Sequence, residues 1–249
     1  METLRERYTV HTFEVDAFGR LAVPALAGLL AEAAGRHATA LGVGLPALMA
    51  RGATWVLVRQ RVEILRPIRL HQEVEVETWP SGIDRLAALR DFVVRGADGA
   101  ELARAASQWY VLDLITRRPR PPQTVLDPGR FQLQGVPRAL DFREGKLPAP
   151  ERWEAEQRFQ VRYADIDQNL HVNNGSYLSW ALEAVPRPLW ESHGLSGLEV
   201  QYRAEALLGD VVLSRRCAEG PGAFVHGIAR EADGRELARL VTRWTAREA

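Results

Sequence analysis

The chain has 249 residues, of which 46% are hydrophobic and 26% charged, and its 32 basic and 32 acidic side chains give a formal net charge of zero. These proportions are typical of a globular protein, and the zero net charge argues against a general binder of nucleic acid or of anionic membranes. A single cysteine, Cys217, excludes an internal disulfide and a cysteine-based metal cluster. No apolar run reaches the roughly 18 residues of a spanning helix, and the first residues do not form a signal peptide, so we expect a cytoplasmic protein.

The first half of the chain predicts a strand, one long helix and four further strands. The first strand is expected at residues 8–15. Residues 22–41 carry apolar side chains at helical spacing, with Leu26, Leu30 and Leu41 on one face, and Gly42 can end this helix. The four strands are expected at residues 54–64, 73–80, 85–96 and 101–114.

The second half repeats this order of elements. A strand is expected at residues 153–163 and a helix at 174–184, with Tyr177, Trp180 and Ala181 in its apolar stripe and Pro186 beyond its end. Strands follow at residues 198–204, 211–219, 223–231 and 236–245. Residues 116–150 hold half of the 14 prolines and predict an irregular but packed linker. We therefore expect domains at residues 1–115 and 151–249, joined by this linker.

A direct repeat supports two copies of one unit. The sequence ADGAELAR at residues 97–104 recurs as ADGRELAR at residues 232–239, and Trp109 then matches Trp244 at the same offset. Each Asp-Gly pair lies between two strand-like runs, which is a signal for a tight hairpin. Asp-Gly turns are common by themselves, but the match continues into the following strand, so we interpret it as a true repeat.

The most informative segment is YADIDQNLHVNNGSY at residues 163–177. It places a carboxylate, a carboxamide and an imidazole at alternate positions, namely Asp167, Asn169 and His171. In an extended segment alternate side chains point the same way, so these three groups would converge. The helix that follows offers backbone N–H groups and a positive dipole end. A carboxylate that activates water, polar positioning groups and N–H donors are what ester or thioester hydrolysis requires.

Each of the three residues also has an ordinary structural interpretation. Asp167 alone is typical of a turn, Asn169 of a loop residue bonded to its own backbone, and His171 of a structural histidine. Their combination favours catalysis, with Asp167 orienting its neighbours or activating water, Asn169 polarising a carbonyl and His171 positioning groups or moving protons. The remaining histidines lack partners at comparable spacing and are predicted to be structural or at the surface: His11, His37, His71, His193 and His226.

Two further structural roles are expected around the three residues. Asp165 has no support from neighbouring polar groups, so we expect it in a turn or at the surface. Asparagine is a preferred first cap of a helix, and either Asn173 or Asn174 is expected to cap the helix that follows. Tyr177 and Trp180 are expected in the core.

The run Asp-x-Asp-x-Asn-x-His-Val-Asn-Asn-x-x-Tyr, which begins at Asp165, resembles the active-site signature of the acyl-acyl-carrier-protein thioesterases, within the wider hotdog-fold thioesterase group. The resemblance implies an α+β protein of two tandem hotdog domains, each an antiparallel sheet wrapped around one long helix, paired as a pseudo-dimer. The stretch from Tyr202 to Glu205 is similar to a second family motif, in which the Glu completes a catalytic set, here Asp167, Asn169, His171 and Glu205. A Cys often follows that Glu in the family, but this chain has Ala206, which excludes a Cys nucleophile there.

The resemblance also implies a reaction and a partner. The expected activity is hydrolysis of fatty acyl-acyl carrier protein to free fatty acid, and the expected partner is the acidic acyl carrier protein. Arg117, Arg118 and Arg120 are candidates for a docking patch, or else belong to a solvated linker. No partnership with nucleic acid or membrane is expected, and the protein would be a monomeric pseudo-dimer or a homodimer.

The two halves are expected to differ in their roles. Residues 17–24, at the corresponding place of the first half, contain no Asp, Asn and His triplet, so catalytic groups are expected in the second half only. The resemblance implies that the first half holds the acyl chain, beside helix residues 26–41 and partly lined by residues 54–58.

Three alternatives remain open. The chain could be an acyl-CoA thioesterase, a hotdog hydratase or dehydratase, or a non-catalytic acyl-binding protein. Sequence also leaves open whether water or a carboxylate attacks the carbonyl. The chain has no Gly-x-Ser-x-Gly motif, so a Ser-His-Asp hydrolase is not expected. No cofactor is expected, because the chain has no phosphate-binding Gly-Lys-Ser/Thr loop and no His/Cys spacing for zinc.

Overall fold

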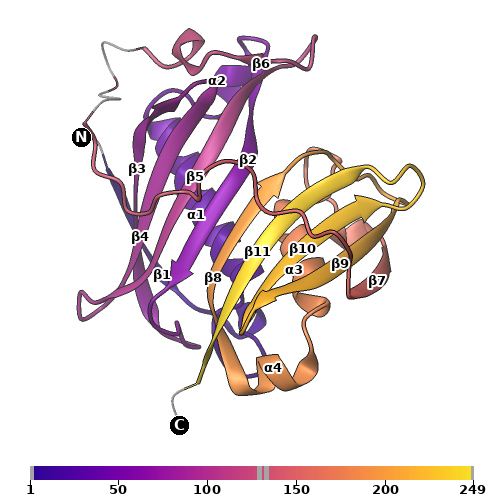
Figure 1. The fold of residues 1–249 in the computed structure, drawn as a ribbon. Helices are drawn as coiled ribbons and strands as arrows, with labels where there is room; N and C mark the ends of the chain where they lie inside the picture. Colours follow the sequence, from indigo (N-terminus) through magenta and orange to yellow (C-terminus); the bar gives the residue numbers. More distant parts are fainter. Residues whose placement is uncertain (1–2, 128–130, 132–134, 248–249) are drawn as a thin grey trace. The chain divides into compact units, whose positions relative to one another are not determined.

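A computed structural model describes residues 3–127, 131 and 135–247. The chain forms two compact units, Met1–Phe142 and Arg143–Ala249. Each unit has an antiparallel sheet and one main helix (Figure 1). None of the helices in the described ranges is long and apolar enough to cross a membrane. Residues 128–130 and 132–134 of the predicted linker, the first two residues of the predicted first domain and the last two of the predicted second domain lie outside these ranges.

The first unit orders five main strands as β1-β3-β4-β5-β2, and each neighbouring pair is antiparallel. A short strand, β6, pairs with β5. The elements of this unit are β1 (Leu4–Thr9), η1 (Thr12–Glu14), α1 (Val23–Ala40), α2 (Leu45–Met49), β2 (Ala53–Ile64), β3 (Glu73–Asp84), β4 (Ala87–Gly96), β5 (Glu101–Asp113), β6 (Pro119–Arg120) and η2 (Pro122–Thr124).

The predicted strand at residues 8–15 is wrong in its position. Strand β1 ends at Thr9, and Thr12–Glu14 forms a short 3-10 helix. The carboxylate of Glu14 accepts a hydrogen bond from the backbone N–H of His11 at 2.8 Å, which closes this turn. The alternating apolar residues predicted a strand here. The hydrogen bond to the buried carboxylate of Glu14 instead stabilises a turn, which the alternation does not reveal.

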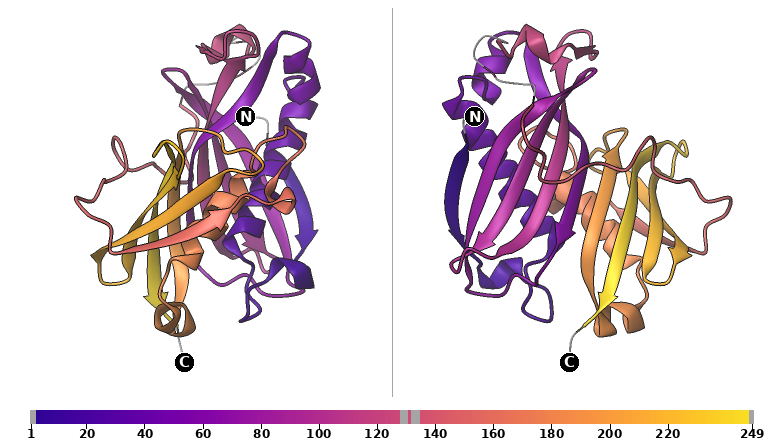
Figure 2. Two further views of the ribbon diagram at one scale, coloured as in Figure 1. Left: turned by 90° about the vertical axis from the view of Figure 1, so that its right-hand side faces the viewer. Right: turned by 60° about the vertical axis from the view of Figure 1, so that its left-hand side comes forward.

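Helix α1 covers the inner face of the first unit's sheet (Figure 2). Its apolar stripe is the predicted one, since Leu26 and Leu30 are nearly inaccessible to solvent. Two apolar clusters form around the helix. The first contains Leu26, Leu30, Val62, Val76, Phe92 and Val94, and the second contains Ala38, Leu41, Val43, Leu48, Ala53 and Val111.

The second unit orders its strands as β8-β11-β10-β9-β7. Helix α3 packs against β9 and β10, and the hydroxyl of Ser214 donates a 2.7 Å hydrogen bond to the carbonyl of Trp180. Tyr177 and Trp180 are buried, as predicted. The elements are β7 (Ala155–Gln160), η3 (Tyr163–Asp165), α3 (Asn174–Glu183), α4 (Arg187–Ser192), β8 (His193–Tyr202), β9 (Val211–Gly220), β10 (Ala223–Arg230) and β11 (Glu236–Ala246).

The sequence repeat corresponds to a repeat of structure. Asp98 and Asp233 each accept a 3.0 Å hydrogen bond from the backbone N–H two residues later, and the glycine after each takes a positive φ, 78° and 67°. Positive φ favours glycine, which explains why both hairpins carry it. Trp109 and Trp244 each donate their indole N–H to the hydroxyl two residues earlier, at 2.7 and 3.1 Å. The predicted hairpins are confirmed.

The proline-rich segment packs against both units in its described parts. Arg138 forms a 2.7 Å ion pair with the buried Asp91, and Val136 packs beside Trp79 on the outer face of the first sheet. Leu147 packs in the second unit with Val225 and Val241. The described parts of this segment therefore contribute side chains to the outer face of each sheet.

Candidate active site

The backbone between residues 166 and 172 is a tight turn. Ile166 and Val172 form an antiparallel bridge, and the N–H of Asp167 donates to the carbonyl of His171 at 2.9 Å. Leu170 takes a φ of 63°, a left-handed conformation that is uncommon for a branched residue. The predicted extended segment is therefore wrong. The turn places the polar side chains in two pairs rather than in one row: Asp167 with Asn169, and His171 with Glu205.

The first pair joins Asp167 to Asn169. One carboxylate oxygen of Asp167 accepts a hydrogen bond from the backbone N–H of Asn169 at 2.8 Å. The carboxamide Nδ2 of Asn169 lies 3.5 Å from the other oxygen, at the outer limit of a hydrogen bond. Asp167 is half-buried and Asn169 is exposed. The carboxylate of Asp167 therefore orients the carboxamide of Asn169.

The second pair joins His171 to Glu205. The Nε2 atom of His171 lies 3.3 Å from a carboxylate oxygen of Glu205, and their side chains keep 31% and 45% of their surface accessible. The two residues are 34 positions apart in sequence. A carboxylate beside an accessible imidazole can activate water or move a proton between oxygen atoms.

Two residues that were not predicted to belong to the site fix the backbone around Glu205. The hydroxyl oxygen of Tyr177 accepts a hydrogen bond from the N–H of Ala206 at 2.9 Å, and Arg230 donates to the carbonyl of Glu205 at 2.7 Å. Burial raises the pKa of Tyr177 to about 12, so it remains a neutral phenol. The only sequence signal for the contact between Tyr177 and Ala206 was the position of Tyr177 at the end of the signature run. That position predicted only that Tyr177 lies in the core.

The start of helix α3 is capped as predicted. The side chain of Asn173 accepts a hydrogen bond from the N–H of Gly175 at 2.7 Å, and its carbonyl accepts one from Ser176 at 3.0 Å. Both N–H groups are therefore directed at the cap. Asp165 closes the preceding turn through a 2.9 Å ion pair with Arg162, but it is 4% exposed, so the turn role was right and the surface position was wrong.

The first unit contains the same turn without the same side chains. Val15 and Leu21 form the corresponding bridge, and Asp16 accepts a 2.9 Å hydrogen bond from the N–H of Phe18. Arg20 then forms a 2.7 Å ion pair with Asp16. Residues 17–24 contain no Asp, Asn and His triplet, as predicted. Asp16, one residue before this segment, is nevertheless the counterpart of Asp167.

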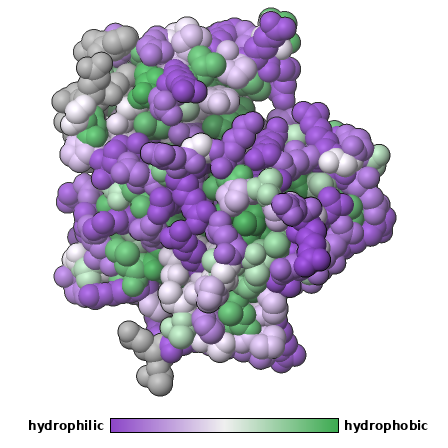
Figure 3. All heavy atoms as spheres, viewed as in Figure 1, coloured by the Kyte–Doolittle hydropathy of each residue, from purple (hydrophilic) through white to green (hydrophobic). Residues whose placement is uncertain are grey.

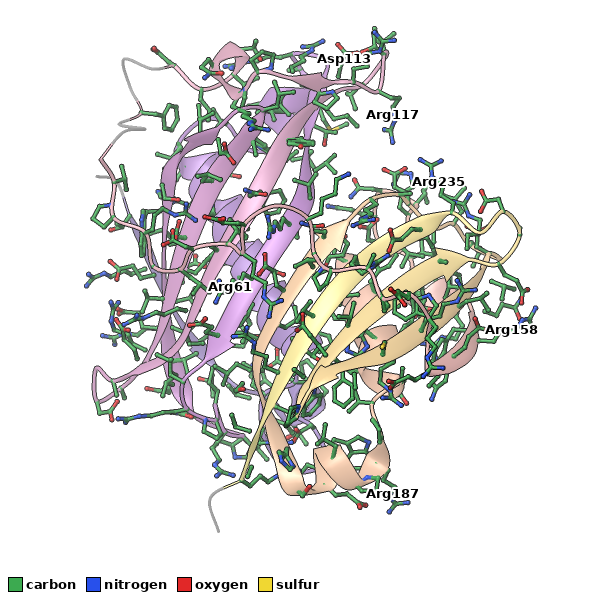
Figure 4. The ribbon with its side chains drawn as sticks, viewed as in Figure 1. Arg61, Asp113, Arg117, Arg158, Arg187 and Arg235 are labelled. Carbon is green, nitrogen blue, oxygen red and sulfur yellow. The ribbon has the colours of Figure 1, made fainter. Side chains whose placement is uncertain are left out.

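Of the three arginines predicted as a docking patch, two are exposed and the third is held by an ion pair. The guanidinium of Arg120 is paired with Asp113 and donates to the carbonyl of Arg51 at 3.2 Å. Arg117 and Arg118 are exposed, and Figure 4 shows Arg117 at the same end of the first unit as Asp113. The face drawn in Figure 3 is mostly hydrophilic, with smaller hydrophobic areas.

Comparison with known proteins agrees with this architecture. A solved acyl-ACP thioesterase from Bacteroides thetaiotaomicron superposes with a TM-score of 0.86 at 25% identity, and covers 98% of both chains. The 12:0-ACP thioesterase from Umbellularia californica gives the same TM-score, identity and coverage. The chain is thus an α+β protein of the hotdog class, as expected.

Family models assign the chain more specifically. The N-terminal domain of acyl-ACP thioesterases matches residues 1–127, and the C-terminal domain matches residues 149–246. The chain belongs to the acyl-ACP thioesterase family, which confirms the resemblance. An oleoyl-acyl carrier protein thioesterase of Coriandrum sativum is 30% identical over 225 residues, which are 84% of this chain and 60% of that protein. The chain spans about 60–64% of the length of such plant relatives.

Proposed function

We propose that this protein hydrolyses fatty acyl-acyl carrier protein and releases free fatty acid. The observation that carries the proposal is the contact between His171 and Glu205 beside the turn that holds Asn169. Membership of the family supports the reaction class. We assign the chemistry to the second unit and binding of the acyl chain to the first, with residues 116–150 as linker, and the product would enter fatty acid metabolism.

We assign the attack on the thioester to a water molecule. Glu205, beside His171, takes the proton as the water oxygen bonds to the carbonyl carbon. The carbon–sulfur bond then breaks, and the leaving thiolate receives this proton through His171. Asn169 donates its carboxamide N–H to the carbonyl oxygen, where negative charge develops. Asp167 acts as a positioning residue, because its two oxygens contact the backbone and the carboxamide of Asn169.

The test is thiol release from matched acyl-carrier-protein and acyl-CoA thioesters of increasing chain length. We expect faster release from the carrier-protein series, and we expect Asn169→Ala and His171→Ala to reduce turnover roughly 10²–10³-fold while the protein stays folded. Glu219→Gln is a matched control, since Glu219 lies on β9 and pairs with Arg143. Wild-type turnover in both site variants would contradict the assignment.

The alternatives give different outcomes in the same experiment. Faster release from CoA thioesters would identify an acyl-CoA thioesterase. A MaoC-like dehydratase from Phytophthora capsici shares the fold with a TM-score of 0.53 at 15% identity, which supports the fold alone. If the protein releases thiol from neither series but hydrates the double bond of an enoyl thioester, it is a hydratase. Binding without any reaction would identify an acyl-binding protein.

Location and assembly stay predictions. A cytoplasmic protein is predicted from sequence, whereas the plant relatives are named as chloroplastic. Fractionation of the source cells tests the location. Light scattering distinguishes a monomeric pseudo-dimer from a homodimer.

A further inference from the structure

A belt of polar side chains crosses the inner face of the first unit's sheet. In register, Gln60 on β2 pairs with Ser107 on β5, and Ser107 pairs with Arg90 on β4. Thr78 on β3 pairs in register with Phe92, two positions along β4 from Arg90, and its hydroxyl accepts a 3.2 Å hydrogen bond from Arg90. Each lies two positions from a residue that packs under α1, so it faces the helix: these neighbours are Val62, Ala105, Phe92 and Val76. All four belt residues are buried.

The belt contains a cation that has only neutral partners in the described part of the chain. One terminal nitrogen of Arg90 lies 3.0 Å from Nδ1 of His37 on α1 and 3.2 Å from the hydroxyl of Thr78. Among the described residues, no carboxylate forms an ion pair with Arg90. The adjacent Asp91 faces the opposite side of the sheet, where it pairs with Arg138.

The charge states of this pair follow from burial. Burial lowers the pKa of Arg90 to about 10, so the guanidinium remains protonated at neutral pH. Burial and the neighbouring Arg90 lower the pKa of His37 to about 4. An Arg can only donate, so neutral His37 accepts at Nδ1 and carries its proton on Nε2.

The fold does not require this belt. The corresponding row of the second unit contains Leu198, Thr242 and Phe224, which pair in register across β8, β11 and β10. Phe224 thus takes the place that Arg90 has in the first unit. A buried cation without a counter-charge is costly, and buried charges are usually paired. Arg90 is therefore a buried cation that forms no ion pair among the described residues, at a position where the second unit has Phe224.

We propose that the belt binds the carboxylate of an alkyl-chain carboxylic acid, with Arg90 as its counter-charge. A carboxylate matches a guanidinium in charge and in geometry. Apolar clusters lie on either side for the alkyl chain, with Leu26 and Phe92 in one and Leu41 and Leu48 in the other. The choice of an alkyl chain rests on the proposed function. A free fatty acid bound here would occupy the unit assigned to the acyl chain and would inhibit the enzyme as product.

Equilibrium binding of dodecanoate and dodecanol to the full chain tests this proposal. The measurement uses the Asn169→Ala variant, so it does not depend on hydrolysis. We expect the carboxylate to bind about tenfold more tightly than the alcohol, and we expect Arg90→Met to remove this preference while the alcohol still binds. Arg90→Lys, which keeps the charge, should retain part of it. Equal binding of the two ligands, or an unchanged preference in Arg90→Met, would overturn the proposal.

A second measurement keeps the test independent of any change at Arg90. The carboxyl signal of [1-¹³C]dodecanoate bound to the unmodified belt should not titrate between about pH 7 and 4, because the guanidinium stabilises the charged form, whereas a free carboxyl group titrates near about 4.3. A signal that titrates like the free acid would place the carboxylate in solvent and overturn the site.

A third measurement identifies the source of the carboxylate. Faster turnover of a dodecanedioic monothioester than of the dodecanoic one would make the carboxylate a substrate terminus. If the two thioesters turn over equally fast, and dodecanoate binds in the first measurement, the ligand is the free acid. Failure of thioester hydrolysis would not affect the first two measurements, so the two proposals fail separately.

Discussion

The turns at residues 15–21 and 166–172 have the same backbone and different chemistry. In each, an Asp accepts a hydrogen bond from the N–H two residues later, at 2.9 Å for Asp16 and 2.8 Å for Asp167. The fifth residue takes positive φ in both, 68° in Gly19 and 63° in Leu170. The Asp is thus part of the turn itself, and its presence alone does not indicate catalysis.

The other three proposed groups have no counterpart of the same kind. Phe18 stands where the second turn has Asn169, and Arg20 where it has His171. A backbone hydrogen bond also fixes the place of Glu205, because the N–H of Val172 donates to the carbonyl of Ala206, the next residue after Glu205, at 3.0 Å. In the first unit Leu21 donates to Ile68 at 2.8 Å, so Pro67 takes the place of Glu205. The comparison separates groups that build the turn from groups that supply chemistry.

The largest expected effect is at the His171 and Glu205 pair. We expect His171→Ala and Glu205→Gln each to reduce kcat/KM roughly 10²–10³-fold, and the double variant to be little worse than either, because the residues act as a unit. Arg20→Ala, the counterpart change in the first unit, should leave turnover within about threefold. Additive losses in the double variant would show that the two residues act separately.

The next largest effect concerns buried histidines, one in each unit. Burial, and to a lesser extent Arg216, lower the pKa of His226 to about 3, as burial and Arg90 lower that of His37 to about 4. Below the unfolded pKa of about 6.5 the unfolded chain binds protons that the folded chain does not, so stability falls as pH falls from about 6.5 to 4. Each histidine should cost on the order of 2–3 kcal/mol at pH 4.

Urea unfolding at several pH values measures this loss. His37→Asn and His226→Gln keep a polar atom at the bonded position and remove the titration, so each should flatten the pH dependence of the urea midpoint in the unit that carries it. A slope as steep as that of the unchanged chain would mean that other groups cause the acid sensitivity.

A smaller effect distinguishes the two turn aspartates. Asp16→Ala and Asp167→Ala should each lower the free energy of unfolding by about 1–2 kcal/mol, because each leaves a turn N–H without its acceptor. Only Asp167→Ala should also reduce kcat, since it releases the carboxamide of Asn169. Thermal melting and steady-state kinetics measure the two effects. A similar loss of kcat in Asp16→Ala would break the distinction between the turns.

The smallest effect is expected at the exposed arginines. Arg117→Ala with Arg118→Ala should raise KM for acyl-carrier-protein thioesters by a few-fold at low salt, leave kcat unchanged, and have little effect on acyl-CoA. Arg120→Ala should instead lower stability, because its guanidinium is bound to Asp113. Equal changes in KM for both substrates would exclude a docking role for Arg117 and Arg118.

The sequence by itself determined the repeat, the main helices and most of the strands. Asp-Gly hairpins, the Leu26 and Leu30 stripe and the Asn173 cap all follow from local rules, because hydrophobic period and turn chemistry act between near neighbours. The signature run also identified the family and the candidate residues. Short elements such as α2 and the turn at Thr12–Glu14 were missed, since a few residues carry too little periodic signal.

The tertiary structure alone decided which groups meet. His171 contacts Glu205 across 34 residues, and Tyr177 and Arg230 hold the backbone there, because strand pairing brings distant segments together. Local spacing predicted an extended row of three side chains, whereas the bridge between Ile166 and Val172 made a turn. His37 was predicted to be structural or at the surface; it is buried, and sheet register placed Arg90 beside it. Contacts between residues far apart in sequence depend on register and packing, and no local pattern encodes either one.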